Sequence, residues 1–374
     1  MGPHKTGTTA LQSAFHAGRV ALARQGVHYL GGGLQPAAAV TALRGSRALR
    51  GDTPASRSTW DALVREAAAA GRRRVVLSSE FLADLGPDEI RGVVDDLGRD
   101  DVHVLVTLRP LWRIAPSQWQ QYVQNAHVTS WPSWLEQMLD RPPYDKPSPS
   151  FWRRHRHDRL VARWVAEVGA DRVVVVAVDD HDRQMLPRSV ESLLALSPGT
   201  LRPHVDRHNR GLTRPEIEVV RHLNKIARRE QWSEGDYAHY VRRAVTRTVK
   251  HRPADPEDLR LHAPDRAVER LLATGREMVT SIRASGVRVV GDLDQLLRPP
   301  AGPADHVGGV RTWLGLPTAA DAVVAAAEAT SAGPVARRPV TDVGVPRLLA
   351  TLVARTGSRL RLRARLALAR RSAR

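Results

Sequence analysis

The sequence predicts an α/β fold in which a central parallel sheet is flanked by helices, followed by a mostly helical C-terminal half. Three observations support this prediction. Short apolar runs alternate with helical segments over roughly the first half of the chain. The runs at 103–109 and 172–180 are almost continuously apolar, as in strands buried on both faces. From Arg214 onward the apolar residues recur at helical spacing.

Each predicted element is bounded by polar residues, Gly or Pro. The expected strands are 26–30, 73–80, 103–109, 172–180 and 287–290. The expected helices are a first one through 10–15, then 58–70, 88–97, 112–125, 158–168, 215–229, 234–249 and 267–285.

The chain divides by composition into three parts. Residues 1–297 form the predicted α/β domain, with a helical subregion at about 214–285. Residues 298–345 read as a linker rich in Pro, Gly and Ala with one short helix, and 346–374 as an Arg-rich amphipathic tail. A chain of 374 residues is long enough for a substantial core.

Composition excludes several kinds of chemistry. There is no cysteine, so disulfides, thiolate metal sites and cysteine nucleophiles are ruled out. We find no signal peptide and no apolar run of about 18 residues that could span a bilayer. A cytoplasmic protein is therefore expected.

The net charge of +18 is unevenly distributed. The segment 347–374 contains nine arginines and no acidic residue, which accounts for half of the excess. This tail could lie as a basic amphipathic helix on an anionic membrane at the inner face, or it could be a solvated extension. No nucleic-acid partner is expected.

Residues 2–9 have the composition of a phosphate-binding loop. They contain two glycines, Lys5 and three threonines, and an apolar helix-like run follows. Glycine allows backbone N–H groups to approach an anion, and the N-terminus of a helix favours negative charge. Lysine adds a positive charge and the hydroxyls add donors.

The order of these residues differs from the ATPase loop G-x-x-x-x-G-K-[ST], because Lys5 precedes Gly7. Instead, residues 2–12 (GPHKTGTTALQ) resemble the 5′-phosphosulfate loop of bacterial sulfotransferases that use 3′-phosphoadenosine-5′-phosphosulfate (PAPS). The resemblance implies a P-loop-type three-layer fold and assigns the 5′-phosphosulfate to a set of loop residues. These are Lys5, Thr6, Gly7, Thr8 and Thr9.

The resemblance also implies what the protein does. PAPS would be the co-substrate, and the sulfuryl group would pass to a hydroxyl or amine of a carbohydrate, glycolipid or secondary-metabolite acceptor, without a metal. The sequence does not identify the acceptor. The segment 131–151, rich in Pro and aromatic residues, is expected to be a substrate-side loop with one short helix.

The 3′-phosphate of PAPS requires a second anion site. The family uses an arginine at a strand end and a serine eight residues later, which Arg109 and Ser117 match. Arginine suits this task because its planar fork matches two phosphate oxygens. For residues 207–212 two interpretations remain open: a plain basic turn, and a loop that closes over the nucleotide.

The acceptor must lose a proton, and some branches of the family use a glutamate for this purpose. Glu80 ends the predicted strand 73–80 and is our candidate base, with a helix-capping or solvated glutamate as the alternative. Lys5 is the second catalytic candidate because it can stabilise charge on the leaving oxygen. His4 is expected to shape the turn, and His155 and His157 to be solvated.

Two further expectations concern the fold and the class of protein. Only Met1 precedes the loop, so the first central strand is expected to be truncated and the chain to fold poorly. A P-loop kinase or NTPase is the rival reading, because Asp179 and Asp180 follow a valine-rich strand as a Mg²⁺-binding acid would. A second alternative is a catalytically impaired, sulfotransferase-like protein that acts as a basic binding module.

Overall fold

The computed structural model describes residues 2–47, 53–140, 149–202, 211–251 and 261–300. The predicted tail and almost all of the predicted linker lie outside these residues, as do 207–210 of the basic segment. Among the described residues, no helix combines the length and apolar character needed to cross a bilayer.

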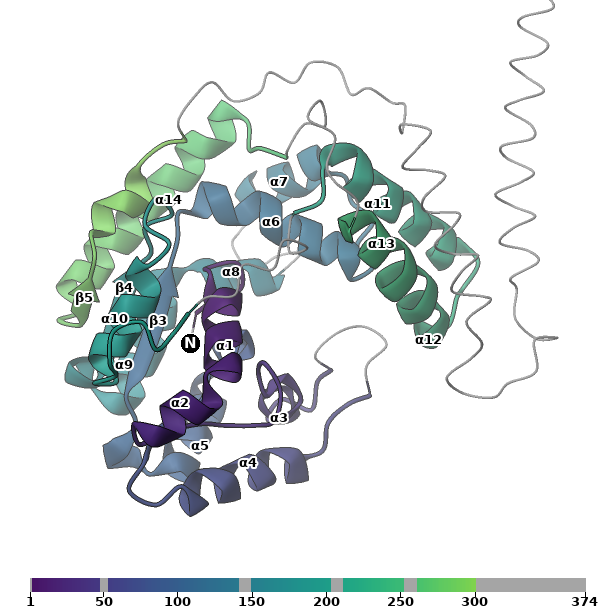
Figure 1. Cartoon of the computed structure of the whole chain (residues 1–374). Coiled ribbons are helices and arrows are strands. Elements are labelled where there is room, and N and C mark those ends of the chain that lie inside the picture. The colour runs from purple at the N-terminus through teal and green to yellow at the C-terminus, as the bar shows by residue number, and fades with distance from the viewer. Residues whose placement is uncertain (1, 48–52, 141–148, 203–210, 252–260, 301–374) are drawn as a thin grey trace, which may run out of the picture.

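The strands form two small parallel sheets (Figure 1). One pairs β1 (Val27–Tyr29) with β2 (Arg74–Val76), and the other has the order β3 (Val104–Leu108), β4 (Val173–Ala177), β5 (Arg288–Val290). The α/β class and the parallel pairing are confirmed. The prediction of one central sheet is wrong for the described residues.

The N-terminal segment joins these two sheets. Thr6 Oγ1 lies 2.8 Å from Thr107 Oγ1 in β3. On the other side, Gln12 donates a hydrogen bond of 3.3 Å to the hydroxyl of Ser78, just after β2. Side-chain contacts of the loop and of the first helix therefore replace a strand-to-strand ladder between β2 and β3.

Helices flank both sheets, and the predicted helices are found close to their expected positions, whereas α2, α3, α7, α8 and α10 were not predicted as separate helices. The α-helices are α1 (Thr8–Ala17), α2 (Arg19–Arg24), α3 (Ala37–Ala42), α4 (Arg57–Ala69), α5 (Pro87–Leu97), α6 (Leu111–Gln124), α7 (Trp131–Asp140), α8 (Pro149–His155), α9 (His157–Val168), α10 (Met185–Leu193), α11 (Arg214–Arg229), α12 (Glu234–Asp236), α13 (Thr246–His251) and α14 (Asp265–Ala284). Short 3₁₀ turns occur at η1 (Glu80–Asp84), η2 (Arg99–Asp101), η3 (Ala170–Arg172) and η5 (Leu293–Leu297), and η4 (Tyr237–Val245) is a π-helix.

The predicted loop 131–151 is instead largely helical, as α7 and the first residues of α8. Its aromatic residues explain the difference, because Trp131, Trp134 and Phe151 are buried and pack on one another. Helical spacing places them on one face of the hydrophobic core beside α6. Residues 131–140 and Phe151 therefore contribute to the core as parts of helices and do not form a loop.

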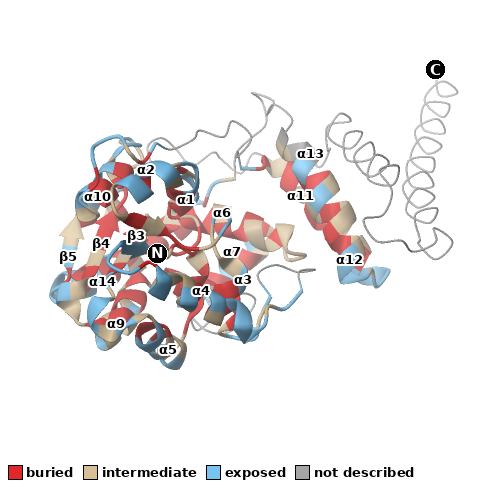
Figure 2. Cartoon of the chain, turned by 60° about the horizontal axis from the view of Figure 1, so that its bottom comes forward, coloured by how far each residue is buried: buried red, intermediate tan, exposed pale blue. Residues whose placement is uncertain are grey.

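The core has three parts that follow the layers. One lies between β3, β4 and the helices α5 and α9, and a second between α6, α7, α11 and α14. The third packs α1 against β1 and β4. In Figure 1, α11 and α13 lie on the side of α6 away from β3 and β4. Figure 2 shows buried residues concentrated on the strands and on the inner sides of these helices.

Candidate functional site

The N-terminal loop is a tight turn that ends at a helix. The backbone N–H of Thr6 donates to the carbonyl of Pro3 at 3.3 Å, and Lys5 takes a left-handed conformation with φ of 71°. Gly7 follows with φ of 92° and directly precedes the ten-residue helix α1. A Cβ at Gly7 would be strained by this φ and would lie 3.1 Å from the guanidinium of Arg109.

The three predicted threonines have different environments. Thr6 is fully buried, and its hydroxyl donates to the carbonyl of Pro3 at 2.7 Å and contacts Thr107. Its side chain therefore stabilises the loop. Thr8 is buried in the first turn of α1, and Thr9 beside it is exposed.

Arg109 lies directly against this loop, although 104 positions separate it from Lys5. It follows β3, and its Nη1 donates to the carbonyl of Lys5 at 3.4 Å. Its Nη2 lies 2.6 Å from a carboxylate oxygen of Asp180, and its buried Nε has no hydrogen-bond partner among the described residues. The structure thus brings together the loop and the arginine that the sequence predicts for a second anion.

Ser117 is half-buried in the second turn of α6, the helix that starts two residues after Arg109. At the helical rise per residue it lies about 9 Å along the axis from Leu111. The described hydrogen bonds include none between Ser117 and Arg109.

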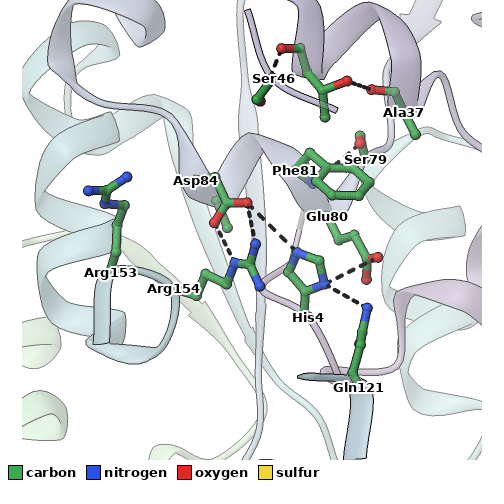
Figure 3. Close-up of polar contacts among 12 residues, drawn as sticks. His4, Ala37, Ser46, Ser79, Glu80, Phe81, Asp84, Gln121, Arg153 and Arg154 are labelled. Carbon is green, nitrogen blue, oxygen red and sulfur yellow. Dashed lines mark hydrogen bonds and ion pairs between the residues drawn. The ribbon is translucent and has the colours of Figure 1, made fainter. Parts of the chain in front are cut away.

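Glu80 lies on the other side of the loop and pairs with His4 (Figure 3). It begins η1, just after β2, and its Oε1 lies 3.2 Å from His4 Nδ1. The other ring nitrogen of His4 lies 4.0 Å from Asp84 Oδ2, and Gln121 Nε2 lies 3.5 Å from Nδ1. His4 is buried between the two carboxylates, while the Glu80 side chain retains 18% of its exposure.

A buried ion pair supports this arrangement from behind. Arg154 donates two hydrogen bonds to the carboxylate of Asp84, one of them at 2.6 Å. Both side chains are largely buried, and in Figure 3 Arg153 points away from them. We call His4, Glu80, Asp84 and Arg154 the charged cluster.

Burial and neighbouring charges set the protonation of these groups. Burial lowers the pKa of His4, and Arg154 lowers it further, against the opposing effect of Glu80. Burial raises the pKa of Glu80, but the hydrogen bond and charge of His4, together with Lys5 and Arg154, outweigh it and lower that pKa overall. Burial also lowers the pKa of Lys5, opposed by Glu80. At neutral pH, Glu80 is therefore ionised.

The acids after β4 do not have the environment of a Mg²⁺ ligand. Asp180 binds both Arg109 and Arg113, whose Nε lies 2.9 Å from Oδ2. Asp179 accepts the backbone N–H of His181 at 2.8 Å and so closes a turn. In the part of the chain that the structure describes, no group of three or more histidine or acidic side chains is placed to hold a metal ion.

The prediction that His155 and His157 are solvated is wrong. Both are fully buried where α8 meets α9. His155 Nε2 lies 3.4 Å from Gln118 Oε1, and both ring nitrogens of His157 lack a hydrogen-bond partner among the described residues. Burial lowers the pKa of His157 to about 4, so the ring is neutral. We call these two residues the histidine pair.

Sequence reasoning missed several members of the site. Asp84 follows Glu80 by four residues, a spacing that could have placed both on one side of a turn. Arg154 carries no comparable signal, because its partner Asp84 is 70 positions away. Asp180 was noted only as a possible Mg²⁺ ligand, and its pairing with Arg109 was not predicted. Neither a family model, nor a curated protein, nor a solved structure matches this chain.

Proposed function

We propose that this chain is a PAPS-dependent sulfotransferase. The observation that carries the proposal is the contact between the N-terminal loop and Arg109. These are the two segments in which the sequence resembles the phosphosulfate and 3′-phosphate sites of that family. An ordinary glycine-rich turn gives no reason for an arginine from another strand to lie against it.

The side chains present fit a nucleotide with two anionic ends. The N-terminus of α1 offers backbone N–H groups and a favourable dipole, and half-buried Lys5 adds positive charge. Arg109 has a buried, unpartnered Nε, and Arg113 lies beside it on the shared carboxylate of Asp180. Lys5, Gly7, Thr8 and Thr9 would hold the 5′-phosphosulfate, and Arg109 with Ser117 the 3′-phosphate. Thr6 would shape the loop without binding the ligand, because its hydroxyl and its backbone N–H both donate to Pro3.

The proposed chemistry needs a proton acceptor and charge stabilisation. PAPS as substrate supplies the sulfuryl group: the acceptor oxygen bonds to sulfur, the sulfur–oxygen bond to the 5′-phosphate breaks, its electron pair remains on the phosphate, and the acceptor proton goes to Glu80. Glu80 is ionised and partly exposed, as this role requires. Lys5 would stabilise the leaving phosphate oxygen.

His4 is a positioning residue in this scheme. It contacts Glu80 through Nδ1 and is fixed between Glu80 and Asp84, so it limits where the Glu80 carboxylate can lie. Because burial keeps its pKa below the usual value, His4 holds Glu80 mainly as a neutral hydrogen-bond donor.

The proposal is tested by transfer of labelled sulfate from PAPS to a panel of acceptors. The panel should contain carbohydrate, glycolipid and secondary-metabolite hydroxyls, and an amine. We expect label in at least one class with the wild-type chain and a large loss with Lys5→Ala. The proposal would be contradicted if the wild-type chain neither bound PAPS nor transferred sulfate to any acceptor.

A further inference from the structure

We propose that Asp180 sets the affinity of the second anion site for a 3′-phosphate, because its carboxylate occupies Arg109 and must be displaced by a phosphate group. This inference rests on the proposed function. Asp180 follows β4 as Arg109 follows β3, and the two strands are neighbours in a parallel sheet. Both residues therefore lie at the same edge of the sheet, against the loop.

The geometry makes Asp180 a stand-in for a bound anion. One carboxylate oxygen lies 2.6 Å from Arg109 Nη2, and the other lies 2.9 Å from Arg113 Nε. The Asp180 side chain is only 14% exposed, so this contact is screened less than a surface ion pair. A phosphate that uses the guanidinium of Arg109 must compete with this carboxylate.

Arg113 makes this competition possible. When Arg109 turns to a ligand, Asp180 keeps the second guanidinium and is not left as a buried, unpaired charge. Arg109 is already incompletely satisfied, because its buried Nε has no partner among the described residues and its contact with the Lys5 carbonyl is long, at 3.4 Å. The arrangement holds Arg109 in place but leaves one of its hydrogen-bond donors, Nε, without a partner among the described residues.

The consequence is a loss of affinity that affects only ligands with a 3′-phosphate. A ligand with a 3′-phosphate can replace Asp180 at Arg109, whereas a 5′-monophosphate gains nothing there. Removing the Asp180 charge should therefore strengthen binding of the bisphosphate and leave the monophosphate unchanged. If Asp180 only holds Arg109 in place, the same change should weaken binding of the bisphosphate.

The test measures binding of adenosine 3′,5′-bisphosphate and adenosine 5′-monophosphate by calorimetry in wild type and Asp180→Asn. We expect the bisphosphate to bind about tenfold tighter to the variant, the scale of one charged hydrogen bond. The matched control is Asp182→Asn, which removes the same charge two residues further along the chain. The Asp182 carboxylate pairs with Arg188 and not with Arg109. Asp182→Asn should change neither affinity.

The outcomes separate the two proposals. Unchanged or weaker bisphosphate binding in Asp180→Asn, with clear binding by wild type, overturns the role of Asp180 and leaves the proposed function standing. Absence of bisphosphate binding in both proteins overturns both. Equal strengthening by Asp182→Asn would reduce the effect to general charge and also overturn the inference.

A double-mutant cycle tests the part assigned to Arg113. Arg113→Ala leaves Asp180 with Arg109 alone and should weaken bisphosphate binding. The same change in the Asp180→Asn background should have almost no effect, because there is no carboxylate left to share. Equal losses in both backgrounds would mean that Arg113 binds the phosphate directly, and would overturn this part of the inference.

Discussion

The charged cluster and the histidine pair show two ways in which this protein buries polar side chains. In the charged cluster, His4 faces Glu80 and Asp84, and Asp84 in turn is bound by Arg154. In the histidine pair, His155 contacts only the neutral amide of Gln118 within the described hydrogen bonds, and His157 has unpartnered ring nitrogens.

The difference shows where chemistry can take place. Charges that are held by opposite charges stay ionised in the interior, and a ligand can exchange for one of them. The histidines of both groups are neutral at pH 7, but only His4 lies against carboxylates, whereas His155 and His157 contribute packing and weak polar contacts. Arg154 of the charged cluster and His155 of the histidine pair are neighbours in the chain, and both side chains are largely buried. Burial alone therefore does not distinguish the two groups.

The largest expected effect comes from removing the proposed proton acceptor of the charged cluster. Glu80→Gln should lower the turnover number of sulfate transfer by about 10² to 10⁴, the range for a general base, with little change in nucleotide affinity. The control is Glu66→Gln, because Glu66 also pairs with a histidine, His28, at 2.8 Å. Equal turnover in Glu80→Gln and wild type would remove Glu80 from the chemistry.

Breaking the ion pair behind the cluster should cost stability. Arg154→Ala leaves the buried Asp84 carboxylate without its guanidinium, and such a change costs about 3–5 kcal/mol of the free energy of unfolding. Denaturant melts measure it against Arg153→Ala, an exposed neighbour that should stay within about 0.5 kcal/mol. Similar small changes in both variants would mean that Asp84 is solvated.

Lys5→Ala tests whether the cluster and the loop act together. Loss of one positioned charge donor costs about 2.7–4 kcal/mol in the activation barrier. The control Lys225→Ala removes an exposed lysine of α11. Near-normal turnover of Lys5→Ala would exclude this lysine from the mechanism.

Lowering the pH should reduce the free energy of unfolding through the histidine pair. The pKa of His157 is about 4 in the folded chain, below its ordinary value of 6.5, so the unfolded chain binds the proton first. The stabilising contribution is complete above pH 6.5 and is lost as the pH falls toward 4. It amounts to roughly 3 kcal/mol.

Melts at a series of pH values check this prediction. His157→Phe should reduce the dependence of stability on pH between 6.5 and 4, and the exposed His222→Phe should not. An unchanged pH dependence in His157→Phe would show that acid acts elsewhere, for example through His4, whose pKa burial and then Arg154 lower below 6.5.

Much of the fold could be predicted from the sequence. Almost continuous apolar runs placed β3 within one residue and β4 within three, and helical periodicity placed α6, α9 and α14. The described parts of 131–151 were predicted as a loop with one short helix because the segment is rich in Pro, although one of these prolines, Pro149, begins α8, where a missing N–H costs nothing.

The site could be predicted only in part. Gly7 and Lys5 identify a loop by local order, and the end of β3 places Arg109 near it. Glu80 was predicted to end a strand, but β2 ends at Val76 and Glu80 begins η1. Contacts between distant segments, such as Asp180 with Arg109, depend on how the strands align and leave no local pattern. The burial of His155 has the same cause, since its ring lies against Gln118 of α6, 37 positions away in the sequence.

The central claim is that the N-terminal loop and Arg109 form one site for a nucleotide with two separated phosphate groups. Calorimetry with adenosine 3′,5′-bisphosphate and adenosine 5′-monophosphate in EDTA, on wild type and Arg109→Gln, tests it directly. We predict tighter binding of the bisphosphate by wild type without metal, and loss of that preference in Arg109→Gln with monophosphate affinity unchanged. Equal affinity of wild type for both nucleotides, or binding that requires Mg²⁺, would contradict it.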